Sequence, residues 1–271
     1  MIKQAIIPLA GLGTRLLPLT SVFAKELLPI NGKPGIEYIL DECIEAGIKE
    51  VIFIISKKKL MIKKYFYNDK FYKDIIKRKK DPRIISEYKK ILRYKKMIKF
   101  VYQDKPLGTG DAVLKTKKLI KDKFFLMLLP DDLIIKKNCS KSMIAIHKKF
   151  NSSVMASMVV SKNNVSRWGI YNIKHKINNQ NFIIKSVIEK PSINDAPSNN
   201  AVIGRYILPK TIFNKLSKLK PGKGEEIHIT DAIQSLIRDN DKFIGHSFSG
   251  KYLDCGTMKG YINSTLEIAK I

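Results

Sequence analysis

The N-terminal segment combines an apolar run, a glycine-rich turn, a helix pattern and a second apolar run. Residues 5–9 form the first run and lead into the turn, which is typical of a buried strand. Residues 36–46 repeat apolar side chains at helical spacing, and Gly47 follows where the helix would end. Residues 51–55 read as a second buried strand. Two strands joined through a helix lie parallel, so the segment predicts a βαβ unit in a parallel sheet.

The remaining elements fall into two parts of different character. Residues 97–102 and 124–129 read as strands, with a helix from about Gly110 between them. A helix is predicted to begin near Thr230 as its N-cap, and another runs from Met258 to the C-terminus. Asn- and Ser-rich turns separate the strands predicted in the second part, which are residues 154–160, 169–173, 182–188 and 201–208. A nucleotide-type α/β half is therefore followed by a more β-rich half, with ligands expected at the carboxyl ends of the parallel strands.

The composition is that of a globular protein. The 271 residues can bury a large core, and 44% of them are hydrophobic. The longest clean apolar run, residues 124–129, is far shorter than the roughly 20 residues that cross a bilayer. Met1 leads directly into the first strand, so no signal peptide is expected. Cys43, Cys139 and Cys255 are scattered, odd in number and without metal-ligand spacing, which favours a cytoplasmic location.

The formal net charge of +27 is, by itself, typical of proteins that bind nucleic acid. Lysine, isoleucine and asparagine are abundant along the whole chain, however, which indicates a drift in composition rather than one basic surface. The densest stretch, residues 57–96, mixes lysines with apolar residues at roughly helical spacing. Solvated helix faces over an apolar stripe explain this stretch better than RNA contact does. We expect no nucleic-acid and no membrane partner. The positive electrostatic potential of the chain would attract phosphorylated substrates.

The glycine-rich turn, residues 9–16, has features of a phosphate-binding loop. Glycines at a bend let backbone N–H groups face a phosphate. Leu16 stands where the dinucleotide fingerprint needs glycine, and the turn lacks the Gly-Lys-Ser/Thr of the ATPase loop. Arg15 and Lys25 follow the glycines instead, and two cations suit a triphosphate whose charge must be neutralised. A Gly-x-Gly turn alone is more often purely structural.

Several motifs in a fixed order resemble those of the sugar nucleotidyltransferases. The first is Leu9-Ala10-Gly11-Leu12-Gly13-Thr14-Arg15-Leu16-Leu17-Pro18, followed by Ala24-Lys25-Glu26-Leu27-Leu28-Pro29 and Lys33-Pro34. The other matching islands are residues 129–132, 187–191, 196–199, 203–206, 224–227, 230–233 and 254–256. The resemblance covers nearly the whole chain, and this many islands in the right order are highly specific.

The resemblance implies one nucleotidyltransferase domain over residues 1–271, with a nucleotide-binding half at about 1–135 and a sugar-phosphate-binding half at about 136–271. The implied fold is α/β, with a Rossmann-like mixed, mainly parallel sheet flanked by helices. The implied reaction transfers a uridylyl group from UTP to glucose 1-phosphate, with Mg²⁺ as cofactor, and releases pyrophosphate. A thymidylyltransferase acting on dTTP and a non-catalytic regulatory relative stay open as alternatives. Relatives form dimers or tetramers, so a homo-oligomer is expected.

Two aspartates are the candidate metal ligands. Asp131 follows an apolar strand and Pro130, so its side chain should emerge at the carboxyl end of that strand. Mg²⁺ prefers oxygen ligands, typically one or two carboxylates with phosphate and water. The resemblance makes Asp254 the partner of Asp131, although the residues alone indicate a turn aspartate. Asp132 competes with Asp131, because adjacent residues of an extended chain point to opposite sides.

The resemblance also assigns the substrate contacts. Glu189 would accept hydrogen bonds from sugar hydroxyls and Lys190 would hold the sugar phosphate, although the pair alone reads as a surface ion pair. Gln103 and Gly108 would face the base, since an amide offers a donor and an acceptor to a pyrimidine edge. Trp168 reads as a core residue rather than a stacking surface. The catalytic cations would be Arg15, Lys25 and Lys190. The nucleotide would also contact Leu9, Ala10, Gly11, Gly13, Thr14 and Glu26, and the sugar would also contact Gly169, Val202 and Gly204.

The sequence departs from close relatives at two places. It reads Gly108-Thr109-Gly110-Asp111 where they more often read Gly-Leu-Gly-His, and Ala24 where they have proline. Neither change removes a phosphate ligand, but both bear on the choice between UTP and dTTP. The four histidines have neither the spacing of metal ligands nor that of a catalytic triad, so they read as structural or surface residues. They are His147, His175, His228 and His246.

Overall fold

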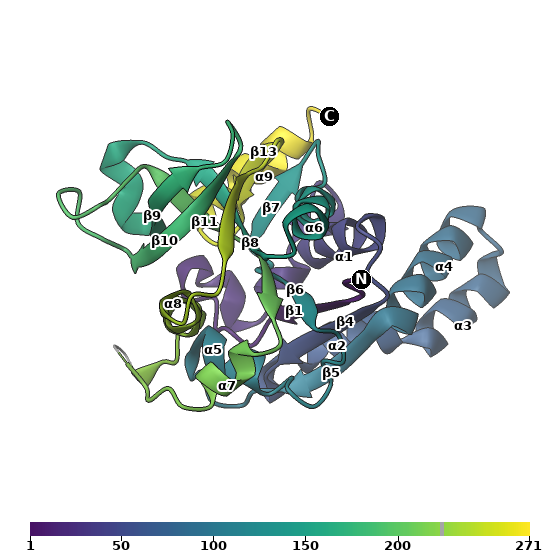
Figure 1. Cartoon of the computed structure of the whole chain (residues 1–271). Helices are drawn as coiled ribbons and strands as arrows, with labels where there is room; N and C mark the ends of the chain where they lie inside the picture. Colours follow the sequence, from purple (N-terminus) through teal and green to yellow (C-terminus); the bar gives the residue numbers. More distant parts are fainter. Residues whose placement is uncertain (223–224) are drawn as a thin grey trace.

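The computed structural model describes residues 1–222 and 225–271. Gly224, which opens the motif at residues 224–227, lies outside the described residues. The strands of the main sheet are β1 (Gln4–Pro8), β4 (Glu50–Ile55), β5 (Ile98–Tyr102), β6 (Phe124–Leu128), β8 (Ser153–Val159), β9 (Gly169–Lys176), β10 (Asn181–Glu189), β11 (Asn200–Pro209) and β12 (Phe243–Ser247). Within the described residues they form nine strands in the order β5-β4-β1-β6-β11-β8-β12-β10-β9 (Figure 1).

The sheet is mixed. β5, β4, β1 and β6 pair parallel, which includes the predicted βαβ unit. β11 pairs antiparallel with both β6 and β8, β8 and β12 are parallel, and β10 is antiparallel to both of its neighbours. The predicted mixed α/β fold is confirmed. The prediction that the sheet is mainly parallel is not, because parallel pairing is concentrated in the strands before residue 129. The β6–β11 pairing carries the sheet without interruption into the second half of the chain.

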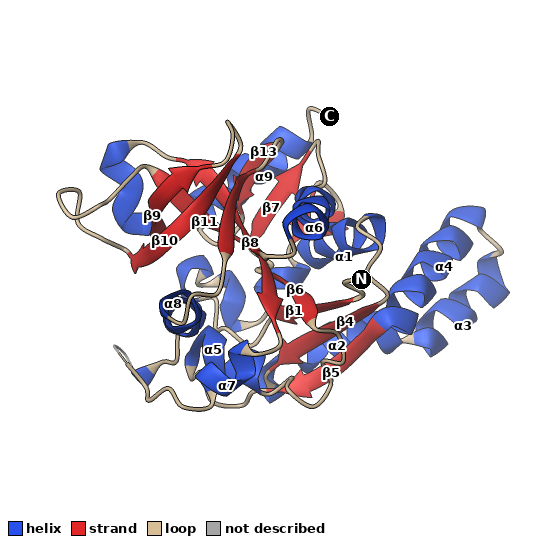
Figure 2. Ribbon diagram, viewed as in Figure 1, coloured by secondary structure: helices blue, strands red, loops and turns tan. Residues whose placement is uncertain are grey.

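Helices cover both faces of the sheet (Figure 2). They are α1 (Gly35–Glu45), α2 (Leu60–Tyr67), α3 (Asp69–Lys79), α4 (Pro82–Met97), α5 (Gly108–Leu114), α6 (Cys139–Phe150), α7 (Ile212–Leu216), α8 (Ile229–Arg238) and α9 (Met258–Ile268). Successive side chains of a strand point to opposite faces, so Ile7 packs with α1, α2 and α6 while Ile6 packs with α5, α7 and α8. The central strands are therefore apolar on both sides.

Two short pairings lie outside the main sheet. β2 (Pro29–Ile30) pairs with β3 (Lys33–Pro34), and β7 (Asp132–Ile135) pairs antiparallel with β13 (Lys251–Asp254). The sequence patterns did not predict β7, β12 or α6. β7 and β13 each have only four residues, too few to display a clear alternation.

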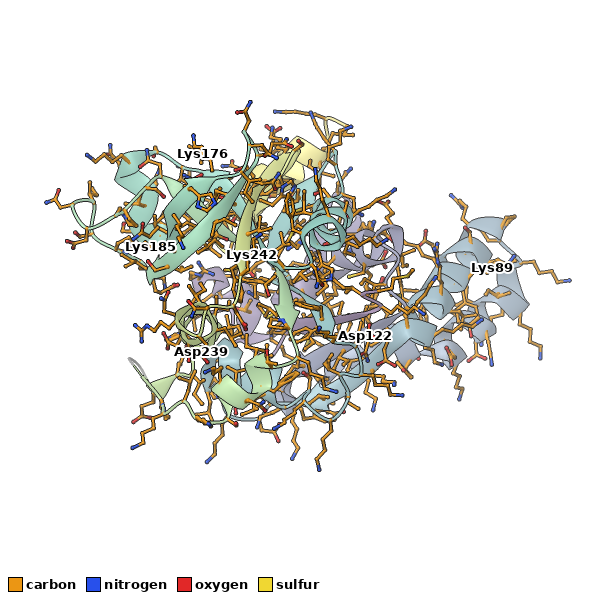
Figure 3. The ribbon with its side chains drawn as sticks, viewed as in Figure 1. Lys89, Asp122, Lys176, Lys185, Asp239 and Lys242 are labelled. Atoms are coloured by element: carbon orange, nitrogen blue, oxygen red, sulfur yellow. The ribbon has the colours of Figure 1, made fainter. Side chains whose placement is uncertain are left out.

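The basic stretch at residues 57–96 is helical, as its spacing predicted. Ile62, Phe66, Ile91 and Tyr94 are buried along α2 and α4, and most of the lysines are exposed. α3 and α4 extend away from the sheet (Figure 1). Elsewhere the lysines are spread over separate elements, as the labelled side chains of α4, β9 and β10 illustrate (Figure 3). The described helices, taken over residues 1–222 and 225–271, are all too short or too polar to cross a membrane.

The helix predicted to begin near Thr230 is present, but Thr230 is not its N-cap. α8 begins at Ile229 with His228 at its N-cap, so Thr230 lies inside the first turn. Tertiary contacts decide this, because the Ile227 N–H donates to the Leu107 carbonyl and the Ile229 N–H donates to the Thr109 hydroxyl. The other two predictions about helix ends are confirmed: Gly47 adopts a φ of 86° after α1, and α9 begins at Met258.

A buried ion pair ties α1 to the centre of the sheet. The Arg205 guanidinium, fully buried on β11, donates to both carboxylate oxygens of Glu42 at 2.8–3.1 Å. Its remaining nitrogen donates to the carbonyls of Leu129 and Gly204, at 3.2 and 2.9 Å. A buried guanidinium needs both the counter-charge and these carbonyls to compensate its lost hydration. The pair thereby fixes the chain just after β6.

We expect Glu42→Gln to lower the free energy of unfolding by roughly 3–5 kcal/mol, because it leaves the Arg205 charge buried without a counter-charge. Urea unfolding followed by circular dichroism measures the loss. The matched control is Glu87→Gln on α4, whose carboxylate is 62% exposed and 3.9 Å from the Lys90 ammonium. The control should change the free energy by about 0.5 kcal/mol or less. Equally small losses in both variants would contradict the role given to the buried pair.

Candidate active site

The glycine-rich turn bends sharply at the carboxyl end of β1. The Leu9 N–H donates to the Ile54 carbonyl at 2.7 Å, which continues the β1–β4 pairing by one residue. Gly13 has a φ of 70°, a conformation that favours glycine, and its carbonyl accepts a 2.8 Å hydrogen bond from the Thr20 hydroxyl. A methyl group at Gly11 would enter space that the described residues leave open. The turn therefore presents bare backbone beside the end of the parallel sheet.

A cavity of about 490 Å³ lies against this turn. Its size is that of ordinary small-molecule sites. Of the predicted site residues, those lining it are Ala10, Gly11, Gly13, Thr14, Lys25, Glu26, Gln103, Gly108 and Asp131. Leu9 is fully buried beneath the turn. A larger groove of about 770 Å³ lies between β9, β10 and the start of β12, and the residues that line it include none of the predicted site residues.

The β7–β13 pairing brings Asp131 and Asp254 together although they lie far apart in the sequence. Asp254 is directly opposite Asp132 in this ladder, and the Cys255 N–H donates to the Asp131 carbonyl at 2.8 Å. A methyl group at Gly256 would lie 2.8 Å from Asp131 Oδ2, 3.3 Å from Asp254 Oδ1 and 2.9 Å from Arg15 Nη2. Two carboxylates and one guanidinium therefore face the same small space over Gly256.

Cations hold the Asp131 carboxylate. Lys25 Nζ lies 2.7 Å and Arg15 Nη2 3.5 Å from Asp131 Oδ2. Burial acts to raise the pKa of the Asp131 carboxyl, but the charges of Lys25 and Arg15 outweigh it and keep this pKa below its ordinary value. Burial likewise acts to lower the pKa of Lys25, but Asp131 and Glu26 outweigh it and raise this pKa. Both groups of the Lys25–Asp131 pair are therefore charged near neutral pH.

Asp132 has different surroundings from Asp131. Its two oxygens accept hydrogen bonds from the Gly204 N–H at 2.9 Å and the Tyr252 hydroxyl at 2.7 Å. Burial and the neighbouring Asp131 charge raise the pKa of Asp132 to about 6. A methyl group at Gly204 would come within 2.5 Å of both the Asp132 carboxylate and Leu129 Cβ, so the small residue allows this loop to pack. Asp132 anchors the loop, and Asp131 faces the cations.

The paired carboxylates suit a hard divalent cation. Mg²⁺ is commonly held by one or two carboxylates and completes its octahedron with phosphate oxygens and water. Asp131 and Asp254 supply two such groups, which converge on Gly256. A cage made of protein alone is not present, since the described residues contain no cluster of three or more Asp, Glu, His or Cys that could hold a metal. The donor set therefore fits a metal shared with a phosphorylated substrate.

Gln103 and Gly108 lie at the far end of the cavity. The Gln103 N–H donates to the Ile55 carbonyl at 2.9 Å, which continues the β4–β5 pairing. Gly108 has a φ of 91°, and a methyl group there would lie 2.6 Å from the Ile227 carbonyl oxygen. The missing side chain of Gly108 thus allows residues 226–227 to cross closely. Asp111, buried below, accepts a 2.8 Å hydrogen bond from the Gln103 side chain.

The predicted sugar contacts gather at a neighbouring place. A methyl group at Gly169 would lie 3.1 Å from Glu189 Oε2 and 3.3 Å from Val202 Cγ2, so these three residues adjoin one another. Lys190 follows Glu189 with a φ of 46°, and its N–H donates to the Trp168 carbonyl at 3.1 Å. Such a backbone conformation is uncommon outside glycine and often marks a functional site. The Lys190 side chain is exposed, and it is not among the residues that line the cavity at the glycine turn.

Comparison with known proteins agrees with this geometry. The family profile for nucleotidyl transferases matches residues 4–271. The chain belongs to the nucleotidyl transferase family. A family relative from Streptococcus pyogenes serotype M1, named UTP–glucose-1-phosphate uridylyltransferase 2, is 34% identical over 99% of this chain and 90% of its own length.

Two solved structures are similar over almost their whole length. A UDP-glucose pyrophosphorylase complexed with UDP-glucose has a TM-score of 0.87 and 36% identity, and covers 100% of this chain and 99% of its own. A UTP-bound enzyme of the same type from Acinetobacter baumannii has a TM-score of 0.88 and 32% identity, with 99% and 93% covered. Both structures therefore share the fold of this chain over nearly its whole length.

Sequence reasoning missed several charged neighbours of the site. Arg167 Nη2 lies 3.2 Å from Asp254 Oδ2, and the buried Lys59 ammonium donates to both oxygens of Glu26, at 2.8 and 2.9 Å. These contacts join segments distant in the sequence, so no local pattern could reveal them. The Glu26 carboxylate is therefore engaged by Lys59 although it lines the cavity. Asp111 did carry a signal, as a departure from the family motif.

We expect Gly256→Ala to weaken the binding of a nucleoside triphosphate with Mg²⁺ by about tenfold or more, because the added methyl group fills the space between the two carboxylates. Isothermal titration calorimetry measures the affinity. Gly222→Ala is the matched control, since among the residues that the structure describes a methyl group there would meet the Glu226 carbonyl oxygen at an ordinary 3.8 Å. Equal affinities in the two variants would show that the space over Gly256 takes no part in binding.

Proposed function

We propose that this protein transfers the uridylyl group of UTP to glucose 1-phosphate, forming UDP-glucose and pyrophosphate. The observation that carries the proposal is the convergence of Arg15, Lys25, Asp131 and Asp254 beside a bare glycine turn. Cations and paired carboxylates at such a turn suit a reaction between two phosphorylated substrates. The choice of UTP and glucose 1-phosphate follows the names of relatives that match 99% or more of the chain at 34–36% identity.

In this proposal the chain acts as one domain whose two halves hold the two substrates. The triphosphate occupies the cavity at the glycine turn, with Leu9, Ala10, Gly11, Gly13 and Thr14 supplying the backbone around it. Gln103 and Gly108 face the base, and Glu26 supports the turn through its pair with Lys59. The glucosyl group lies against Gly169, Glu189, Val202 and Gly204, with Lys190 on its phosphate. An assembly of two or four copies is part of the same proposal.

The chemistry requires positioning and charge stabilisation rather than a nucleophilic side chain. A phosphate oxygen of glucose 1-phosphate attacks the α-phosphorus of UTP in line. A new P–O bond forms as the bond from the α-phosphorus to the bridging oxygen breaks, and pyrophosphate leaves on the opposite side. The attacking oxygen is already anionic, so no general base is needed. Arg15, Lys25 and Lys190 hold the two polyanions together and stabilise the charge of the transferring group.

A divalent ion completes the site, and we propose Mg²⁺. Asp131 and Asp254 would hold it, and when bound it supplies positive charge that the phosphate oxygens share. Lys25 and Arg15 balance Asp131 before the substrates enter. A non-catalytic relative is disfavoured, because a protein that only binds has no need to keep all five ionic residues, Arg15, Lys25, Asp131, Lys190 and Asp254. A thymidylyltransferase shares every one of these features, so the nucleotide assay must separate it.

The deciding experiment measures pyrophosphate release from UTP or dTTP with a panel of sugar 1-phosphates, with and without Mg²⁺. We expect the fastest release with UTP and glucose 1-phosphate, and only with the metal. Asp131→Asn should lower this turnover by about a hundredfold or more, because it removes a charged metal ligand. Asp132→Asn, its neighbour and control, should retain turnover. If only Asp132→Asn lost turnover, Asp132 rather than Asp131 would be the metal ligand. If the wild-type protein released no pyrophosphate with any substrate pair, the proposed function would be refuted.

Lys190→Ala should lower kcat/KM for glucose 1-phosphate by about a hundredfold or more, because an ammonium on the attacking phosphate is lost. Circular dichroism should show an unchanged fold, since the side chain is exposed. Lys185→Ala, which changes an exposed lysine of β10, the strand that ends just before Lys190, is the control and should leave kcat/KM unchanged. Near-normal turnover of Lys190→Ala would remove the phosphate role assigned to it.

A further inference from the structure

Asp111 is a buried charged residue that contacts the cavity-lining Gln103 from behind, and the proposed reaction does not use it. It stands in the first turn of α5 and is only 8% exposed. Its Oδ2 accepts a 2.8 Å hydrogen bond from Gln103 Nε2, and its Oδ1 lies 3.5 Å from the Lys115 ammonium. A buried carboxylate is costly unless it is paired and hydrogen-bonded. Here both partners of Asp111 are identified, and one of them is the side chain proposed to face the base.

The surroundings of Gln103 allow one orientation of its amide. Nε2 lies 3.1 Å from the Gly108 carbonyl oxygen as well as 2.8 Å from the Asp111 carboxylate. A carbonyl and a carboxylate only accept hydrogen bonds, so both demand the NH₂ group of the amide. Turning the amide over would set its oxygen against two other oxygens. Gln103 is buried and lines the cavity, so its Oε1 is the atom left for a ligand.

An amide oxygen at this place recognises a particular kind of base. Uracil and thymine carry an N3–H donor between two carbonyls, and this N–H can donate to Oε1. Cytosine carries an unprotonated N3 acceptor at the same position, which would face another acceptor. We propose that Asp111 is a positioning residue for nucleotide choice: it locks the Gln103 amide so that the cavity accepts an imide base and rejects cytosine. This inference rests on the proposed function, and it leaves UTP and dTTP equivalent at this contact.

Lys115 makes Asp111→Asn an informative variant. The Lys115 ammonium only donates, so it attracts the carbonyl oxygen of the substituted amide and turns the new NH₂ group toward Gln103. A donor then faces the Gln103 side chain, which favours the reversed amide. Asp111→Leu removes the acceptor without adding a donor. Of the two acceptors that orient the Gln103 amide, the Asp111 carboxylate and the Gly108 carbonyl, only the carbonyl then remains. Both variants should therefore relax the choice of base.

The experiment measures kcat/KM for UTP, dTTP and CTP with glucose 1-phosphate and Mg²⁺ by pyrophosphate release. In Asp111→Asn and Asp111→Leu the UTP:CTP ratio should fall by about tenfold or more, the size of one lost or opposed buried hydrogen bond. The UTP:dTTP ratio should stay within about twofold, because both bases carry N3–H. Asp74→Asn on α3 makes the same chemical change at an exposed position and should alter neither ratio.

A double-mutant cycle with Gln103→Ala tests whether Asp111 acts through the amide. In the Gln103→Ala background, Asp111→Asn should leave the UTP:CTP ratio unchanged. An equal fall in that background, or an unchanged ratio in the folded single variants, would overturn the inference while leaving the proposed function intact. Wild-type protein that releases no pyrophosphate from UTP and glucose 1-phosphate would instead refute the function itself.

A wild-type measurement covers the case in which the variants do not fold. N3-methyl-UTP keeps both carbonyls of the base but lacks the N3–H donor. We expect the wild-type protein to bind it at least about tenfold more weakly than UTP in calorimetric titration. Equal affinity for UTP, CTP and N3-methyl-UTP would show that Oε1 of Gln103 does not read the base, and would overturn the inference without any substitution.

Discussion

The buried Arg205–Glu42 pair is the contact on which the placement of the site depends. The guanidinium reaches from β11 to a carboxylate of α1 and to the carbonyls at positions 129 and 204. The chain leaves β6 at this point and turns into the loop that carries Asp131. With Leu129 and Gly204 fixed, Asp132 can accept from the Gly204 N–H, and the adjacent Asp131 is directed to the opposite side. This ion pair, neither member of which lines the cavity at the glycine turn, thus positions the carboxylate that we propose as a metal ligand.

The site balances its own charges before any substrate enters. Lys25 and Arg15 compensate Asp131, and Arg167 compensates Asp254. These contacts lower the cost of burying carboxylates close together, which otherwise raises a carboxyl pKa, as it does for Asp132. In the proposed function, a triphosphate and its metal ion would exchange with these pairs, so that the carboxylates contact the metal and the side-chain cations contact phosphate. The surrounding net charge of +27 favours the approach of such anions at long range.

Much of the fold could be predicted from local patterns, and much of the site could not. The apolar runs of β1, β4 and β6 are buried on both faces and therefore read clearly as strands. β7 and β13 are short and hold their place by pairing with each other, so the ladder that unites Asp131 with Asp254 left no periodic signal. Arg167 and Lys59 act only through partners distant in the sequence. The N-cap of α8 is His228 rather than the expected Thr230, because contacts with residues 107–109 outweigh the local capping preference.

The glycines show most clearly why a motif is read incompletely from sequence. Gly11 borders open space, as a phosphate-binding turn requires, whereas Gly108 and Gly204 are small because Ile227 and Asp132 come close to them. A sequence motif treats these glycines alike. Gly11, however, leaves space for a ligand, whereas Gly108 and Gly204 allow other parts of the chain to pack closely against them. The same holds for Asp111. In the sequence it is only a departure from the motif, whereas the structure shows its hydrogen bond with Gln103 and its ion pair with Lys115. In this cavity the shape is set by close backbone approaches, while selectivity depends on which way one amide is held.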